Sequence, residues 1–512
     1  MELVEQRSAK SEKAIKGKEQ TEGEGGAGSG AVEVTMGGGR RRLCSSTVLG
    51  AALALISILL ALVWAPILDY FGRKALTLLP GTMSYENWHN PPVPMHMDFY
   101  FFNWTNPHRI ATEKPHFVEM GPYRYNEKRR KVNITWNGND TVTYRNLRQW
   151  FFSQDESSGS HNDLITTVNA VALAAARRVR YKSKFEQRTT SLALTLMSQG
   201  VHVTKPVRQL LFDGYSDPLV TLGHTFSSAN SPFDRFGWFY KRNGSYSFDG
   251  TFTINTGVTD MNRLGVLERW NYNTRTSFYP GRCGNVYGGS GDLYPPGAKN
   301  KHSNVSLYSA DICRSLTMTY AREEDVQGVP VLRFEADPQL LDNGTQLPGN
   351  ECFCNGDCVP SGLLNLTRCR FGMPAFVSFP HFHNADPFYL RQVDGLSPDA
   401  ARHTFFMSVE PTMGYPLDMA ARIQVNLLVE PSQHIALFDK VPHPMFLPVL
   451  WVEQRFALPP DVAASLRMAL LLPTIGYTVI LICFLVGVGI AVYSVMQTKK
   501  EEPIKLQHKT LT

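Results

Sequence analysis

The chain has 512 residues, of which 43% are hydrophobic and 19% are charged. It is therefore too long for one small module and too apolar for a chain that is mostly disordered. Its 51 lysines and arginines exceed the 45 acidic residues by only six. So weak a positive charge, spread over such a length, excludes a protein built chiefly to coat nucleic acid.

Two long uncharged runs near the ends of the chain predict membrane-spanning helices. The first covers 26 residues, 43–68, and the second covers 29 residues, 468–496. At about 1.5 Å per helical residue, each run can cross a hydrocarbon layer roughly 30 Å thick. A cleaved signal peptide is the alternative for the first run, but the 42 residues before it and its own length argue against one. We therefore expect two anchors with a large domain, 69–467, between them.

Charges and glycosylation acceptors predict which side of the membrane each part faces. Three arginines, Arg40 to Arg42, precede the first run, and two lysines follow the second, which favours cytosolic tails at 1–42 and 497–512. The first tail is rich in glycine without apolar periodicity, and we expect it to be disordered. Acceptor triplets occur only between the two runs, which places that part outside the cytosol. The seven acceptors are Asn103, Asn133, Asn139, Asn243, Asn304, Asn343 and Asn365.

The cysteines fit an oxidising compartment. Six of them fall within 87 residues of the middle part, and an even number predicts three disulfides. A zinc site is the alternative for 352–358, but CxC followed by CxxxC is not the spacing of a zinc knuckle. Cys44 differs, because its place at the start of the first run makes it a candidate for S-acylation. The six are Cys283, Cys313, Cys352, Cys354, Cys358 and Cys369.

The middle part is predicted to be mostly β. The segments 141–147 and 246–255 are rich in β-branched and aromatic residues, and each follows a turn rich in Asn and Gly. The region 162–209 departs from this pattern. We expect helices there, with Asn162 or Asp163 as the N-cap and an apolar stripe at helical spacing.

This helical region is also strongly basic. Between 164 and 207 there are seven lysines and arginines against one acidic residue. We interpret it as an electropositive cap that gathers anionic ligands, and an ordinary solvated helical face is the alternative. The candidate ligand-binding residues are Arg177, Arg178, Arg180, Lys182, Lys184 and Arg188.

Motifs of common enzymes are missing from the sequence. It contains no HExxH, no GxSxG and no P-loop. His381 and His383 share a face of a strand-like run, and we interpret them as packed or hydrogen-bonded side chains rather than metal ligands. We therefore expect no catalysis, no metal and no cofactor.

Six short motifs carry a resemblance to a known family. Taken in order between two terminal anchors, they resemble the class B scavenger receptors, and the likeness covers roughly 63–493. This family includes the fatty-acid translocase, the high-density-lipoprotein receptor, the lysosomal integral membrane protein and the insect sensory neuron membrane proteins. The motifs are FFNWTNP at 101–107, EMGPYRY at 119–125, DICRS at 311–315, SFPHF at 378–382, EPTMG at 410–414 and RIQVN at 422–426.

The resemblance implies an α+β membrane protein. Its exterior domain would be an irregular antiparallel β-barrel, crossed by an apolar tunnel and covered by a helical cap. The N-terminal tail is longer than is usual in the family, and the dileucine signal of the lysosomal member is missing. The implied disulfide pairs are Cys283 with Cys352, Cys313 with Cys369, and Cys354 with Cys358.

The expected function is that of a receptor for lipid uptake or endocytosis. It would capture lipids or anionic lipoprotein-like ligands at the cap and pass lipid through the tunnel to the membrane. The expected partners are fatty acids, sterols, phospholipids or lipoprotein particles and the membrane itself, with a protein ligand as a further candidate. The expected location is the plasma membrane, with endosomal or lysosomal membranes as the alternative. Two other functions stay open: an adhesion or escort receptor on the same fold, and a subunit of a two-span ion channel.

Overall fold

The computed structural model of the chain divides into two compact units. At the two outer ends, 38–44 and 498–507, only the backbone is described. The helical unit contains the described residues up to Val63 and from Tyr477 onward, and the body contains Trp64–Gly476. The ranges described are 38–221, 233–297 and 300–507.

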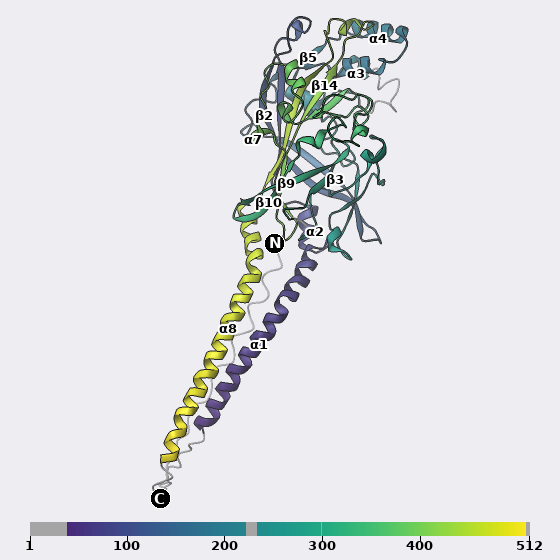
Figure 1. Cartoon of the computed structure of the whole chain (residues 1–512). Coiled ribbons are helices and arrows are strands. Elements are labelled where there is room, and N and C mark those ends of the chain that lie inside the picture. The colour runs from purple at the N-terminus through teal and green to yellow at the C-terminus, as the bar shows by residue number, and fades with distance from the viewer. Residues whose placement is uncertain (1–37, 222–232, 298–299, 508–512) are drawn as a thin grey trace, which may run out of the picture. The chain divides into compact units, whose positions relative to one another are not determined.

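The helical unit is made by two long helices, α1 (Gly38–Leu76) and α8 (Pro460–Gln507), which lie side by side (Figure 1). Small residues let their backbones approach closely, because a Cβ placed on Gly50 would lie 2.6 Å from the carbonyl oxygen of Gly487. Thr47 donates a hydrogen bond of 2.8 Å to Ser494 across the pair.

Both long helices are apolar enough to cross a membrane. The qualifying segments, Ser45–Leu76 and Pro460–Gln497, have mean hydropathies of 2.6 and 2.7. The first extends beyond the C-terminal end of its predicted run and the second beyond both ends, because the helices continue past the uncharged residues. The predicted S-acylation of Cys44 and the disorder of the N-terminal tail concern residues or side chains outside those that the structure describes.

The body is built on one antiparallel sheet of 13 strands that is nearly closed into a barrel. Its main path runs β7-β6-β3-β2-β1-β15-β14-β13-β10-β9-β8, while β12 pairs with β14 and β11 pairs with β12. The two edges are joined through Gly289, which bridges to Val266 beside β7 and to Leu307 in β8. The sheet therefore encloses an interior, and this confirms the barrel that the resemblance implies.

The strands of this sheet have the following bounds. They are β1 (Met95–Trp104), β2 (Phe117–Trp136), β3 (Thr141–Phe152), β6 (Thr251–Asn255), β7 (Leu267–Trp270), β8 (Val305–Ser309), β9 (Arg314–Val326), β10 (Val329–Ala336), β11 (Leu364–Asn365), β12 (Ala375–Ser378), β13 (Phe406–Val409), β14 (Pro416–Val429) and β15 (Met445–Ala457).

Of the two strands predicted from the sequence, one is confirmed over its whole length and the other begins later than predicted. The segment 141–147 lies within β3, which continues to Phe152. The segment 246–255 forms a strand only from Thr251 onward. Gly250, with φ of +83°, lies against the side chains of Trp270 and Asn271, and this turn delays the start of the strand.

The cap of the body consists of α3 (Ala170–Arg178), α4 (Lys184–Leu196), β4 (Leu164–Val168) and β5 (His202–Pro206). It lies at the end of the body opposite the start of α8 (Figure 1). The helical prediction for 162–209 was too wide, because β4 and β5 pair as an antiparallel hairpin at its edges. The first N-cap is Asn169, whose side chain accepts from the backbone N–H of Ala172, and not Asn162 or Asp163.

Shorter helices and helical turns connect the strands. The helices are α2 (Met83–His89), α6 (Pro387–Gln392) and α7 (Ala400–His403), and the turns are Pro107–Arg109, Gln209–Asp213, Met261–Arg263, Gly281–Gly284, Pro338–Leu341, Glu351–Phe353, Pro380–Phe382 and Ala436–Phe438.

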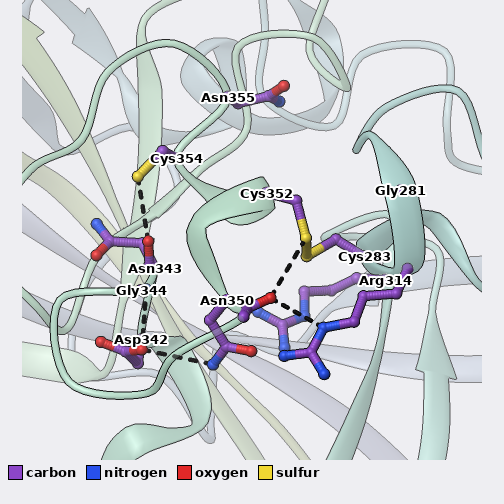
Figure 2. The surroundings of a disulfide bond; sticks show 12 residues. Gly281, Cys283, Arg314, Asp342, Asn343, Gly344, Asn350, Cys352, Cys354 and Asn355 are labelled. Atoms are coloured by element: carbon purple, nitrogen blue, oxygen red, sulfur yellow. Dashed lines mark hydrogen bonds between the residues drawn. A yellow bond between two sulfur atoms is a disulfide. The ribbon is translucent and has the colours of Figure 1, made fainter.

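Three disulfides fasten the loops on one side of the body, and their pairing is the one that the resemblance implies. Figure 2 shows the bond between Cys283 and Cys352, beside a loop organised by Asp342. That carboxylate is buried and accepts backbone N–H bonds of 2.9 Å from Gly344 and 3.0 Å from Leu347. Burial opposes its ionisation, but these bonds hold the pKa of Asp342 below its usual value. The pairs are Cys283–Cys352, Cys313–Cys369 and Cys354–Cys358.

The glycosylation acceptors fall into different environments. Asn133, Asn139 and Asn304 are exposed. Asn343 and Asn365 are only 2% and 1% exposed. Their amide groups donate to backbone oxygens, that of Val359 at 2.7 Å and that of Cys354 at 3.2 Å. A sugar on either amide nitrogen would prevent this burial, so we now expect these two acceptors to stay unmodified in the folded protein.

The other two acceptors are held by hydrogen bonds. Asn103 is half-buried and accepts from the N–H of Thr166 at 2.8 Å. Asn243 is exposed, but its amide donates to the carbonyl of Trp150 at 2.9 Å. Neither is as enclosed as Asn343 or Asn365.

Folded molecules made in a secretory compartment should carry sugar at Asn133, Asn139 and Asn304 and none at Asn343 and Asn365. Enzymatic deglycosylation in heavy-oxygen water, followed by peptide mass spectrometry, converts each occupied asparagine to a labelled aspartate. Occupancy of either buried site in correctly folded protein would contradict the packing described above.

Candidate functional site: a cavity with a charged belt

The interior of the body contains a cavity of about 950 Å³. This lies near the upper end of the usual range for ligand pockets, roughly 300 to 1,000 Å³. Its walls come from the inward faces of the sheet and from three helices. Apolar side chains such as Met97 of β1 and Ile423 and Val425 of β14 supply much of the wall.

The strand β15 shows how the wall is organised. Side chains two residues apart point to the same face of a strand, so one set lines the cavity while the alternate set faces outward. Of this lining set, only Gln454 is polar, with two apolar residues on each side of it. The set is Leu450, Val452, Gln454 and Phe456 of β15, followed by Leu458 just after the strand.

The cavity extends between opposite ends of the body. At one end it is lined by Val171 and Ala174 of the cap helix α3. At the other it is lined by Met83 of α2 and by Leu466 and Ala469 of α8. Ala469 lies within the second uncharged run of the sequence. The cavity thus reaches from the cap to the first residues of the apolar helix.

A row of seven charged side chains, which we call the charged belt, interrupts this apolar lining. Arginines and carboxylates alternate along it, and every member except Glu127 lines the cavity. The belt begins and ends with an arginine, so four positive charges face three negative ones. In order, its members are Arg129, Glu127, Arg148, Asp249, Arg242, Asp311 and Arg370.

Glu127 holds the first part of the belt together. Its carboxylate accepts two bonds of 2.8 Å from Arg148 and one of 2.9 Å from Arg129. Trp150 donates to it as well, at 3.2 Å. Burial opposes the charge on Glu127, but the two arginines outweigh that effect and lower its pKa to about 2. In the orientation that satisfies both of its polar atoms, Gln454 accepts from Arg129 at 2.6 Å.

Arg242 holds the second part together. It donates to Asp249 at 3.0 Å and lies 2.7 Å from Asp311. Arg242 is only 4% exposed, yet its Nε–H has no hydrogen-bond partner among the residues that the structure describes. Arg370 ends the belt with the longest ion pair, 3.9 Å from Asp311, and keeps 25% of its side chain accessible.

A separate neutral pair lies near the belt. Lys131 is fully buried and donates to Asp292 at 2.8 Å and to Asn146 at 2.9 Å. Ser290 also donates to Asp292, at 2.9 Å. Because the lysine and the carboxylate neutralise each other, this pair leaves the excess positive charge of the belt unchanged.

Two of the six predicted cap residues are parts of the framework. Arg177 forms ion pairs with Asp357 and Glu430, and its side chain is only 11% exposed. Arg180 pairs with the same two carboxylates, at 3.3 and 2.9 Å. These contacts fasten α3 to the rest of the body. Their partners lie some 180 and 250 residues away along the chain, so no local pattern could reveal them.

The other four predicted residues, Arg178, Lys182, Lys184 and Arg188, are exposed. Arg178 also lines the cavity at its cap end. Large apolar side chains lie on the same surface, because Phe185 is 79% and Leu196 is 75% exposed. Basic and apolar groups therefore share the solvent-facing side of the cap.

The two histidines singled out from the sequence are held by protein groups. His381 lies in a helical turn rather than in a strand, and one ring nitrogen contacts Glu119 while the other accepts from the N–H of Ser397. Throughout the described ranges with side chains, no cluster of three or more His, Cys, Asp or Glu is arranged to hold a metal.

Replacing Glu127 with Gln should destabilise the body, because Arg129 and Arg148 would lose their carboxylate partner inside the protein. The loss should be about 3 to 5 kcal/mol of unfolding free energy. Glu113→Gln is the control, since its pair with Arg109 is exposed, and it should change stability little.

The pairing of Glu127 with its two arginines also makes the stability of the body depend on pH. Since the pKa of Glu127 falls from 4.5 to about 2 on folding, its contribution is complete above about pH 4.5 and is lost as the pH drops toward 2. Chemical unfolding of the full-length chain in detergent at pH 7, 5 and 3 measures both effects. A Glu127→Gln variant as stable as wild type would contradict the described pairing.

Comparisons with known proteins agree with this architecture. A model of the CD36 family matches residues 48–498. Protein peste of Drosophila melanogaster is 37% identical over 420 residues, which cover 80% of this chain and 75% of that protein. Scavenger receptor class B member 1 of Cricetulus griseus is 34% identical over 414 residues, 80% of each chain. Lysosome membrane protein 2 of Homo sapiens is 31% identical over 416 residues, 80% of this chain and 85% of that one.

The family match takes in nearly everything between the two tails, and these relatives all exceed 30% identity over most of both chains. The chain therefore belongs to the CD36 family of class B scavenger receptors, which are membrane receptors and not enzymes.

Proposed function

We propose that this protein takes up lipid from a ligand bound at the cap and carries it through the cavity of the body to the membrane. The observation that carries the proposal is the extent of the cavity lining, which includes Val171 of the cap and Ala469 of the apolar helix α8. A passage between these two ends would deliver lipid at the level of the bilayer. The body would lie outside the cytosol, with both tails inside.

The physical reason for such a passage is the cost of exposing a lipid chain to water. Each methylene contributes roughly 0.8 kcal/mol, so a chain of sixteen carbons would meet a barrier on the order of 12 kcal/mol without shelter. An apolar cavity that ends at the membrane removes most of this barrier. Family membership supports lipids or lipoprotein particles as ligands, and it supports a plasma-membrane or lysosomal location.

The surface of the cap supports docking on anionic lipid particles. Lys182, Lys184 and Arg188 supply positive charge, and the exposed side chains of Phe185 and Leu196 can enter the interfacial layer of a lipid surface. Arg177 and Arg180 are left out of this docking surface because their ion pairs hold the cap in place.

The passage can be tested by filling it. Ala421 of β14 lines the cavity, so Ala421→Trp should reduce transfer of a fluorescent cholesteryl ester from lipoprotein particles into vesicles that hold the full-length protein. Ala401→Trp is the matched control, because Ala401 is exposed on α7. We expect a several-fold slower transfer for the first variant only, with binding of the particles unchanged.

The result also separates the proposed function from its main alternative. An escort or adhesion receptor binds its protein partner without using the cavity, and would capture that partner equally well after Ala421→Trp. Transfer at the wild-type rate in an Ala421→Trp protein that folds would remove the cavity from the mechanism.

The docking surface can be tested by its charge. The double variant Lys182→Gln with Lys184→Gln should bind phosphatidylserine liposomes roughly thirtyfold more weakly than wild type, since each lysine near an anionic surface contributes about 1 kcal/mol. Wild-type binding should weaken as salt rises, because the Debye length shortens. The control pair, Lys128→Gln with Arg130→Gln, removes two exposed charges from β2, far from the cap in sequence.

The measurement is liposome sedimentation with the protein held in neutral nanodiscs. Equal loss of binding in both double variants would show a response to overall charge rather than to the cap.

A further inference from the structure

We infer that the charged belt is a binding station for a lipid with a singly charged anionic head group, a carboxylate or a phosphodiester, whose chains lie in the apolar parts of the cavity. The inference rests on the proposed function, because it concerns lipid within the same cavity. It assigns residues and a ligand charge to a site that is separate from the cap.

The first reason is the charge of the belt. Its four arginines exceed its three carboxylates by one positive charge, and the nearby Lys131 and Asp292 cancel each other. A surplus charge in a largely apolar interior is unfavourable unless a counter-charge joins it. One negative charge would make the belt neutral.

The second reason is that donors are available. The Nε–H of Arg242, which lines the cavity, has no partner within the described part of the chain. Arg370 donates to the backbone carbonyl of Asp311, but its ion pair with that residue's carboxylate is the longest of the belt and 25% of its side chain stays accessible. A carboxylate presents two charged oxygens, and a phosphodiester presents two non-bridging oxygens, and guanidinium groups bind such oxygen pairs well.

The third reason is the position of the belt along the cavity. Gln454, which contacts Arg129, precedes the first residue of α8, Pro460, by six residues, or roughly 20 Å along an extended strand. Apolar lining residues lie on both sides of it, Val452 toward one end and Phe456 toward the other. A head group at the belt can therefore leave its chain in apolar surroundings.

These features separate the belt from an ordinary structural salt-bridge network. A network that only stabilises the fold gains nothing from an unbalanced charge or from a buried arginine N–H that lacks a partner among the described residues. The inner members, Glu127 and Arg148, do have a structural role, because both are buried and strongly paired. The outer member Arg370 is the residue whose loss should change ligand binding more than folding.

The test compares ligands that differ only in charge. Palmitate and hexadecanol share one chain length, and phosphatidylglycerol and diacylglycerol form a second pair for the phosphodiester. Binding to the full-length chain in nanodiscs is measured as the excess over empty nanodiscs, near neutral pH. Wild type should bind at least one anion about 10 to 100 times more tightly than its neutral partner, as expected for a charge-assisted bond inside a protein.

The variant Arg370→Gln should lose this preference and retain hexadecanol binding. The control Arg391→Gln, which removes an exposed arginine of α6 outside the cavity lining, should keep it. If Arg370→Gln fails to fold, Arg129→Gln at the other end of the belt provides the same comparison. Preference for palmitate or for phosphatidylglycerol identifies which head group the station takes.

The outcomes separate this inference from the proposed function. If the wild-type protein binds neutral and anionic lipids equally, or if Arg370→Gln and Arg129→Gln both keep the preference, the belt is not the station although the cavity still holds lipid. If none of the four lipids binds above empty nanodiscs, both the station and lipid carriage by the cavity are wrong.

Discussion

Closure of a single antiparallel sheet is the constraint on which the rest of the structure depends. Strands that return on themselves bury two faces, one against the surrounding loops and helices and one against the interior. The bridges of Gly289 to both sheet edges complete this enclosure. β15 pairs with β1 on one side and β14 on the other. Because the sheet closes, the side chains on one face of β15 line an enclosed cavity. Without closure, the apolar lining would become an exposed surface.

The charged belt shows that such an enclosure need not be uniformly apolar. Removing two opposite charges from water is unfavourable, and their attraction offsets this only if the geometry is good and the remaining donors are satisfied. The pairing of Glu127 with Arg148 meets that requirement through two bonds of 2.8 Å. The outer end, at Asp311 and Arg370, meets it less well. The belt therefore combines a tightly paired inner part with an outer end where Arg370 lies 3.9 Å from the carboxylate of Asp311 and donates to its backbone carbonyl.

The sequence predicted the features that depend on local pattern. Two uncharged runs predicted the apolar helices, and motifs along the chain predicted the family and its barrel. The cap was located but not bounded: the β-branched residues of β4 and Pro206 at the end of β5 disfavour a helix, but only their pairing with each other shows the hairpin. Arg177 looked like a free basic residue because its partners, Asp357 and Glu430, are distant in sequence. Asn343 and Asn365 matched a triplet that carries no information about burial.

The charged belt could not be predicted from the sequence either, because its members are distant from one another along the chain. Its members come from β2, from β3 and from three separate loops, and nothing in the 45 acidic and 51 basic residues marks these seven as neighbours. A charge that is isolated in the sequence becomes part of a network only when the sheet closes. Unpaired charges on a solvated face and paired charges in an interior therefore cannot be distinguished without the fold.

The low pKa of Glu127 has a consequence for where the protein can work. At the pH of about 5 to 6 found in acidic endosomal compartments, this carboxylate stays ionised and the inner belt keeps its charge. A lipid carboxylate with an ordinary pKa near 4 to 5 would be at least half ionised there, and neighbouring arginines would lower its pKa further. Acidification alone would therefore not release an anionic lipid from the belt. In the mechanism that we propose, release would come from competition for the arginines or from the gain in burying the chain in the bilayer, and the direction of transfer would follow the supply of lipid rather than the pH of the compartment.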